Sequence, residues 1–290
     1  MWSCFERLKV RRMTVAITTI LVGTDGSPAS QAAMRWAAGL AFACQAAVHA
    51  VYAWSPDQSE LRPPIAARQK RQAEAKLDEW CSPLRRARLR YKAEVVEGAP
   101  EGVLREEAER IDPDLVVIGT RGRQGLVVLG LGAVAHGLVH RLPVPVTVVP
   151  PSIATFPGGP VVVGVDGSDA SLVPLLWGAG LAGALRRPLL AVHGLGRAET
   201  FGVEGWPQPD VGPVQAHVTL VEEQHGRIPL ELVPDSPGPA LDEVAEARDA
   251  PAVVVGGLRR GLLAELRLGH TPVLLVEHGA RPVVIVPDRV

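Results

Sequence analysis

The sequence predicts an α/β protein that contains two copies of one parallel-sheet domain. Short β-branched apolar runs alternate with helical patterns, which is typical of βαβ crossovers and a parallel sheet. The second half repeats the first, because Asp166 matches Asp25 and Trp177 matches Trp36 at the same offset of 141 residues. The length of 290 residues is also that of two ordinary domains.

The first half contains five predicted strands separated by helices. A strand at 16–24 ends at the turn Asp25-Gly26-Ser27-Pro28-Ala29-Ser30, which contains helix-capping residues and leads into a helix that ends at Ala43. There follow a strand at 48–54, a polar loop at 55–65, a charged helix at 66–88, a strand at 91–97 and a helix at 101–111. The last elements are a strand at 114–118, a helix at 134–141 and a strand at 144–149.

Composition sets the expected domain limits. These are an N-terminal extension at 1–14, expected to be disordered, a first domain at 15–150, a linker rich in Pro and Gly at 151–160, and a second domain at 161–290. The two halves end in similar strands, at 144–149 and 283–286. We therefore expect the domains to pack as a pseudo-twofold pair through these strands.

The two halves differ in charge. Residues 1–150 carry 20 Lys and Arg against 15 Asp and Glu, and residues 151–290 carry 10 against 16, so the net charges are +5 and −6. An anionic ligand therefore favours the first half, and electrostatic attraction between the packed halves is a compatible interpretation.

A glycine-rich loop follows the fourth strand. Gly119 ends the strand, Gly122 follows after two intervening residues, and Gly132 opens the next helix. Such a loop directs backbone N–H groups and a helix N-terminus toward an anion, and the nearby Arg121 adds a cationic donor. This arrangement predicts a phosphate site. The alternative is a strand-to-helix turn that needs the glycines only for its geometry.

The spacing of this loop resembles the G-x2-G-x9-G-[ST] signature of ATP-binding universal stress proteins, except that Ala133 replaces the hydroxyl residue. Residues 15–290 as a whole resemble a tandem universal stress protein, the two-domain form common in actinobacteria. The resemblance includes Thr24–Ser27, its repeat Val165–Ser168, and Gly98-Ala99-Pro100 before a helix. It implies two Rossmann-like domains, each an open five-stranded parallel sheet of strand order 3-2-1-4-5 with flanking helices and a site at the carboxyl ends of strands one and four.

The resemblance also implies a set of ATP contacts in the first half, with Mg²⁺ held through the phosphates. Asp25 would bind the ribose or adenine side, although it could simply cap its helix, and Val51 would meet adenine through its backbone or be plain sheet core. The phosphates would lie against the loop glycines and the first N–H groups of the following helix. The full set is Gly23, Asp25, Val51, Gly119, Arg121, Gly122, Gly132, Ala133 and Val134. The missing hydroxyl at Ala133 would weaken binding about tenfold.

The second half departs further from this pattern. Arg259 stands at the position of Gly122, and His270 at that of Ala133. A bulky arginine at a glycine position blocks close phosphate approach, so we expect this half to have lost ATP binding.

Other chemistry lacks its residues in this sequence. There is no Gly-Lys-[Ser/Thr] phosphate loop and no Gly-x-Ser-x-Gly elbow, so we expect no catalytic residue and no enzyme, with slow ATPase activity as a weaker alternative. His136 and His140 stand four residues apart without an evident third ligand, so no protein-held metal is expected. Neither nucleic acid nor membrane is expected as a partner, because no apolar run reaches about 18 residues and the basic run at 85–92 fits a solvated helix end.

Two functions stay open on these grounds. One is an ATP-binding stress-response module that signals through a homodimer or a regulatory protein, and the other is a nucleotide-free scaffold whose site has decayed. Three cysteines without metal-like spacing, and no visible signal peptide, favour the cytoplasm.

Overall fold

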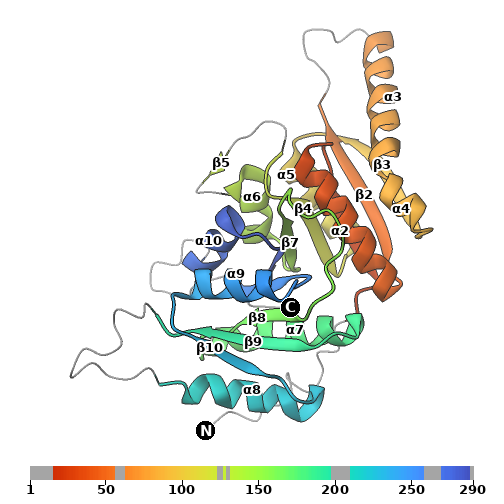
Figure 1. Cartoon of the computed structure of the whole chain (residues 1–290). Helices are drawn as coiled ribbons and strands as arrows, with labels where there is room; N and C mark the ends of the chain where they lie inside the picture. The colour runs from red at the N-terminus through yellow and green to blue at the C-terminus, as the bar shows by residue number, and fades with distance from the viewer. Residues whose placement is uncertain are drawn as a thin grey trace.

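A computed structural model describes residues 16–55, 63–122, 127–128, 131–196, 210–257 and 269–287 (Figure 1). The extension predicted at 1–14 lies outside the described residues. Among the helices that are described, none combines the length and the apolar character needed to cross a membrane.

The first half forms five parallel strands in the order β3-β2-β1-β4-β7. Their bounds are β1 (Thr19–Gly23), β2 (Ala47–Trp54), β3 (Tyr91–Glu97), β4 (Leu115–Gly119) and β7 (Val146–Val149). This is the predicted order 3-2-1-4-5, which is therefore confirmed. The first strand is the central one, with β2 on one side and β4 on the other. Its apolar run suits this place, where helices cover both faces of the sheet.

The second half repeats this order as β10-β9-β8-β11-β12. Its strands are β8 (Val161–Gly164), β9 (Leu189–Gly194), β10 (Leu230–Val233), β11 (Val253–Gly256) and β12 (Val283–Val286). The α/β prediction with two tandem sheets holds for both halves.

The two halves join into one ten-stranded sheet through an antiparallel pair, β7 with β12 (Figure 1). Thr147 lies opposite Val284 in this register. The prediction that the halves meet through their last strands is confirmed. All other neighbouring strands of the sheet run parallel, so the two sets of strands point in opposite directions across this seam.

Helices cover both faces of the sheet, and each face has its own apolar core. The core of one face contains Val22 of β1 with residues of α2 (Pro28–Cys44), α3 (Pro63–Trp80), α4 (Ser82–Arg86), α7 (Asp169–Leu185) and α8 (Gly212–His225). The core of the other face contains Leu21 with residues of α5 (Pro100–Ile111), α6 (Ala133–Arg141), α9 (Pro237–Ala247) and α10 (His270–His278). Each core runs through both halves, so the halves share their hydrophobic stabilisation.

Two predicted elements differ from the structure. The single helix expected at 66–88 is two helices, since α3 ends at Trp80 and α4 begins at Ser82 with Pro83 in its first turn. Proline has no N–H to continue the earlier helix but suits the start of a new one. The glycine loop contains a two-stranded hairpin, β5 (Val127–Val128) with β6 (Leu131–Gly132), which was not predicted.

The segment predicted as a linker, 151–160, packs against both halves. Ile153 is buried, and the ring of Phe156 lies 5.8 Å from that of Trp36. The N–H of Gly158 donates to Asp249 Oδ2 at 2.8 Å. The connection between the halves is therefore part of the folded core.

Candidate functional site

A pocket of about 400 Å³ opens at the carboxyl ends of β1 and β4, where the strand order reverses. Every residue predicted as a ligand contact lines it: Gly23, Asp25, Val51, Gly119, Arg121, Gly122, Gly132, Ala133 and Val134. The fold thus brings together residues that are up to 111 positions apart, from Gly23 to Val134. Ligand pockets in open α/β sheets lie at this kind of reversal.

The turn between β1 and α2 forms one wall. Asp25 Oδ1 accepts a hydrogen bond from the N–H of Ser27 at 3.0 Å, and Ser27 Oγ accepts from the N–H of Ser30 at 3.2 Å. Ser27 is thus the N-cap of α2, in the turn where capping residues were predicted. Asp25 also faces the glycine loop, because a Cβ on Gly122 would lie 2.9 Å from its Oδ2.

The glycines of the loop fit where a side chain would not. A Cβ on Gly119 would lie 2.6 Å from the carbonyl carbon of Ala29, and one on Gly132 would lie 2.8 Å from the carbonyl oxygen of Thr120. Both positions therefore need glycine for backbone packing, whatever the pocket holds. The Ser27 hydroxyl also donates to the Arg121 carbonyl at 3.2 Å, which fixes the start of the loop against α2.

The N-terminus of α6 forms the polar end of the pocket. Its N-cap is Gly132, which supplies no side-chain hydrogen bond, and the exposed Ala133 is the first helical residue. The first-turn N–H groups and the positive end of the helix dipole favour a negative charge at this place. The exposed Arg121 adds a cationic side chain to the same end.

The same pocket has an apolar wall, and most of this wall was not predicted. It consists of Val51, Tyr52, Ala53, Trp54, Pro100, Leu104 and Ile118. Two signals could have identified it: Val51 and Ala53 share one face of β2 by period two, and Pro100 and Leu104 share one face of α5. Apolar residues of this kind can pack against a planar ring.

The equivalent place in the second half differs in chemistry. Asp166 Oδ1 accepts from the N–H and the hydroxyl of Ser168, at 2.9 and 2.6 Å. Burial raises the pKa of Asp166, but these hydrogen bonds outweigh burial and hold the pKa below its ordinary value. His193, the counterpart of Tyr52, donates from Nδ1 to the Val165 carbonyl at 2.7 Å, so an imidazole lies across the strand ends. His270 begins α10 at the place of Ala133, and Arg259 lies outside the described residues.

The sequence matches a family model over both of these halves. The model is that of the universal stress protein family, and the matched residues are 16–150 and 159–287. The chain belongs to this family. The family model matches twice along the chain, so the tandem arrangement expected from the resemblance is confirmed.

Curated relatives share this tandem organisation along most of their length. Universal stress protein Rv2623 of Mycobacterium tuberculosis is 27% identical over 287 residues, which cover 92% of this universal stress protein and 95% of the relative. Universal stress protein Rv2005c of the same organism is 32% identical over 212 residues, which cover 69% of each chain.

Solved structures agree on the fold. A universal stress protein from Archaeoglobus fulgidus superposes with a TM-score of 0.72 at 15% identity, covering 95% of this chain and 99% of that one. A universal stress protein from Pseudomonas aeruginosa gives a TM-score of 0.61 at 15% identity, covering 94% of each chain. These likenesses establish the double-domain fold.

Proposed function

We propose that this universal stress protein is an ATP-binding regulatory module that carries its nucleotide in the first half. One observation carries the proposal: the N-terminus of α6, without a side-chain cap, opens into the same pocket as the glycine loop and an apolar wall. A nucleotide has the same two parts as this pocket: its phosphates form an anionic end, and its base forms a planar, largely apolar end. The pocket volume of about 400 Å³ is within the range of small-molecule sites.

The proposal gives each wall a role. Adenine lies against the apolar wall, beside the backbone of Val51, and the ribose lies toward Asp25. The phosphates lie between the glycine loop and the first N–H groups of α6, where Arg121 adds charge-assisted donors. Mg²⁺ would be carried by the phosphates.

In this proposal the protein binds and reports nucleotide and has no catalytic residue. The stress-response role follows the family, and the signal would pass to a second copy of the chain or to a regulatory protein. Ala133 is the weak contact, since it offers an N–H without a hydroxyl. The competing proposal is a scaffold whose pocket no longer holds ATP.

The test is calorimetric titration of ATP and magnesium into the tag-free full-length chain. Gly122→Arg copies the residue of the second half into an exposed loop position and is expected to abolish binding. Gly183→Arg is the matched control, because a Cβ at that helical glycine would have no atom within 4 Å apart from its chain neighbours and the backbone of its own helix. Circular dichroism checks that both variants remain folded.

Each outcome separates the two proposals. Binding by wild type and by Gly183→Arg, with none by Gly122→Arg, supports the pocket as the nucleotide site. Unchanged binding by Gly122→Arg puts the ligand elsewhere. If wild type binds no ATP at millimolar concentration, the scaffold proposal replaces this one.

A further inference from the structure

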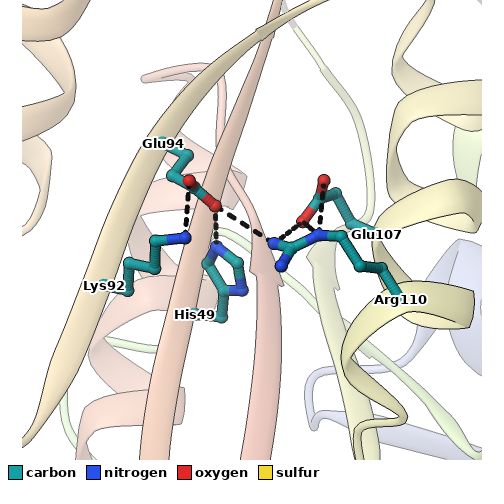
Figure 2. A network of polar contacts seen from close by, with 5 residues as sticks. All are labelled: His49, Lys92, Glu94, Glu107 and Arg110. Atoms are coloured by element: carbon teal, nitrogen blue, oxygen red, sulfur yellow. Dashed lines mark hydrogen bonds and ion pairs between the residues drawn. The ribbon is translucent and has the colours of Figure 1, made fainter.

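We propose that His49, Glu94 and Glu107 form a binding site for a divalent transition metal such as Zn²⁺, and that Arg110 is the counter-ion of the metal-free state. Figure 2 shows these residues together with Lys92. None of the three proposed ligands lines the nucleotide pocket. The site is therefore additional to the proposed function and does not depend on it.

The three ligands converge from three separate elements. His49 lies on β2, Glu94 on the edge strand β3 and Glu107 on α5. One donor atom from each lies within 4.8 Å of the others. His49 Nε2 and Glu94 Oε2 are 2.7 Å apart, so the imidazole points directly at the carboxylate. In the proposed metal-bound state, side-chain rotations bring all three donor atoms to one ion.

Secondary structure explains why these side chains meet. His49 and Val51 face the same side of β2, the side that α5 covers, because side chains alternate along a strand. On α5, Glu107 stands one turn after Leu104, which packs against that same face of the sheet. The ligands are thus held by regular elements with packed neighbours.

One histidine nitrogen and two carboxylate oxygens suit a metal ion that is borderline between hard and soft. Zn²⁺ binds histidine nitrogen and carboxylate oxygen, and three protein ligands leave a position for water. The His49 side chain is 7% exposed and that of Glu107 is 13% exposed, so both are fixed in place. His49 Nε2 lies 2.7 Å from Glu94 Oε2, and Lys92 Nζ lies 2.6 Å from Glu94 Oε1, so both oxygens of this carboxylate already contact nitrogen atoms.

Arg110 takes the place that a cation would take. Its guanidinium contacts Glu94 Oε2 at 3.2 Å and both carboxylate oxygens of Glu107. The Arg110 side chain is 49% exposed, and that of Lys92, the other cation on Glu94, is 60% exposed. Two cations with largely exposed side chains therefore neutralise two less exposed carboxylates, and we expect a metal ion to replace these cations without disturbing the core.

A cleft beside the cluster gives the ion a route. Its volume is about 510 Å³, and Glu94, Glu107 and Arg110 all line it. The cleft has room for water ligands and for the displaced arginine. Sequence spacing gave no sign of this site, because the three ligands are scattered along the chain and no two stand on one element.

The test is calorimetric titration of Zn²⁺ into the tag-free, metal-stripped full-length chain. His49→Ala and Glu107→Gln each remove a ligand and are expected to weaken binding at least tenfold. Arg110→Ala removes the competing cation and is expected to tighten binding several-fold. A purely structural network predicts no such opposite effect.

Two controls accompany these variants. Arg105→Ala removes a neighbouring arginine of α5 that pairs with Glu109 instead, and should leave Zn²⁺ binding unchanged. His136→Ala disrupts the imidazole pair with His140, whose ring centroid lies 4.5 Å away, and tests whether that pair takes the metal. Glu107→Gln keeps the side-chain shape, so it stands as the ligand test if His49→Ala does not fold.

The proposal is overturned by any of three results. These are no Zn²⁺ binding by wild type at millimolar concentration, binding by Glu107→Gln equal to wild type, or no tightening in Arg110→Ala. Loss of binding in His136→Ala instead assigns the metal to α6. Because ATP is absent from the titration, failure here does not affect the proposed nucleotide site.

Discussion

The indole Nε1 of Trp36 donates a hydrogen bond to the carbonyl oxygen of Pro251 at 2.8 Å. Trp36 belongs to α2 of the first half, and Pro251 precedes β11 of the second. Both residues are buried, and Phe156 of the connecting segment packs against the same indole. A single side chain thus ties the two halves and their connection together.

Trp36→Phe is expected to lower the free energy of unfolding by about 1–3 kcal/mol, because it leaves the buried Pro251 carbonyl without its donor. Urea denaturation followed by circular dichroism measures the change. Trp177→Phe is the control, since Trp177 holds the equivalent place and makes no such hydrogen bond within the described residues. An equal loss in both variants would mean that ring size, and not the hydrogen bond, sets the effect.

Gly26→Ala is expected to destabilise the protein more than Gly167→Ala. Both glycines have φ of +77°, so alanine costs about 1–2 kcal/mol at either place. At Gly26 a Cβ would also lie 2.1 Å from the Trp80 ring, whereas at Gly167 the nearest atom is 3.1 Å away. Overpacking adds about 1–3 kcal/mol to the first variant only. Thermal melts of the two variants compare them directly, and matching melting temperatures would refute the packing argument.

Ala133→Ser is expected to tighten ATP binding about tenfold, which corresponds to about 1.4 kcal/mol for one regained charge-assisted hydrogen bond. The serine hydroxyl would stand at the first residue of α6, on the pocket wall. Ala133→Val adds bulk without a hydroxyl and serves as the control. Calorimetry in magnesium reads the affinities, and equal affinity for serine and alanine would show that the phosphates lie away from this residue.

Stability is expected to fall as the pH drops below about 6.5 because of His217, which is buried against Ser171 in the second half. Burial lowers the pKa of His217 from its ordinary value of 6.5, and Asp169 and Asp166 oppose this effect only in part. The unfolded chain therefore binds more protons than the folded chain below that pH, and the free energy of unfolding decreases, by at most about 1.4 kcal/mol per pH unit.

His217→Gln should flatten this pH dependence, while His225→Gln, at an exposed histidine of the same helix, should not. Urea denaturation at several pH values between 5 and 8 measures both. A wild-type slope retained in His217→Gln would assign the effect to another group.

The sheet and the glycine-rich side of the pocket were largely predictable because they depend on local patterns. Buried strands such as β1 and β4 are short β-branched runs, and Gly119 and Gly132 mark places where backbones must approach closely. Whether the predicted residues bind ATP stays a prediction, since the same glycines also serve packing. The domain limits predicted at 15–150 and 161–290 likewise stay a prediction.

Other features depend on contacts between distant residues, and sequence reasoning missed them. The apolar wall joins Trp54 of β2 to Leu104 of α5, and the charged cluster joins His49 to Glu107. No local period connects such pairs. The break between α3 and α4 was not predicted for a different reason. Pro83 was visible in the sequence, and a proline at this place should have ended the longer predicted helix.

The antiparallel seam between β7 and β12 joins two similar domains within one polypeptide, as an interface joins two subunits in a dimer. A dimer of identical subunits dissociates on dilution and must keep both copies alike, since one gene encodes both. Here the covalent connection keeps the seam closed at any protein concentration. Each domain can therefore acquire substitutions that the other does not share. Tyr52 and His193, which differ at matching strand ends, are one example.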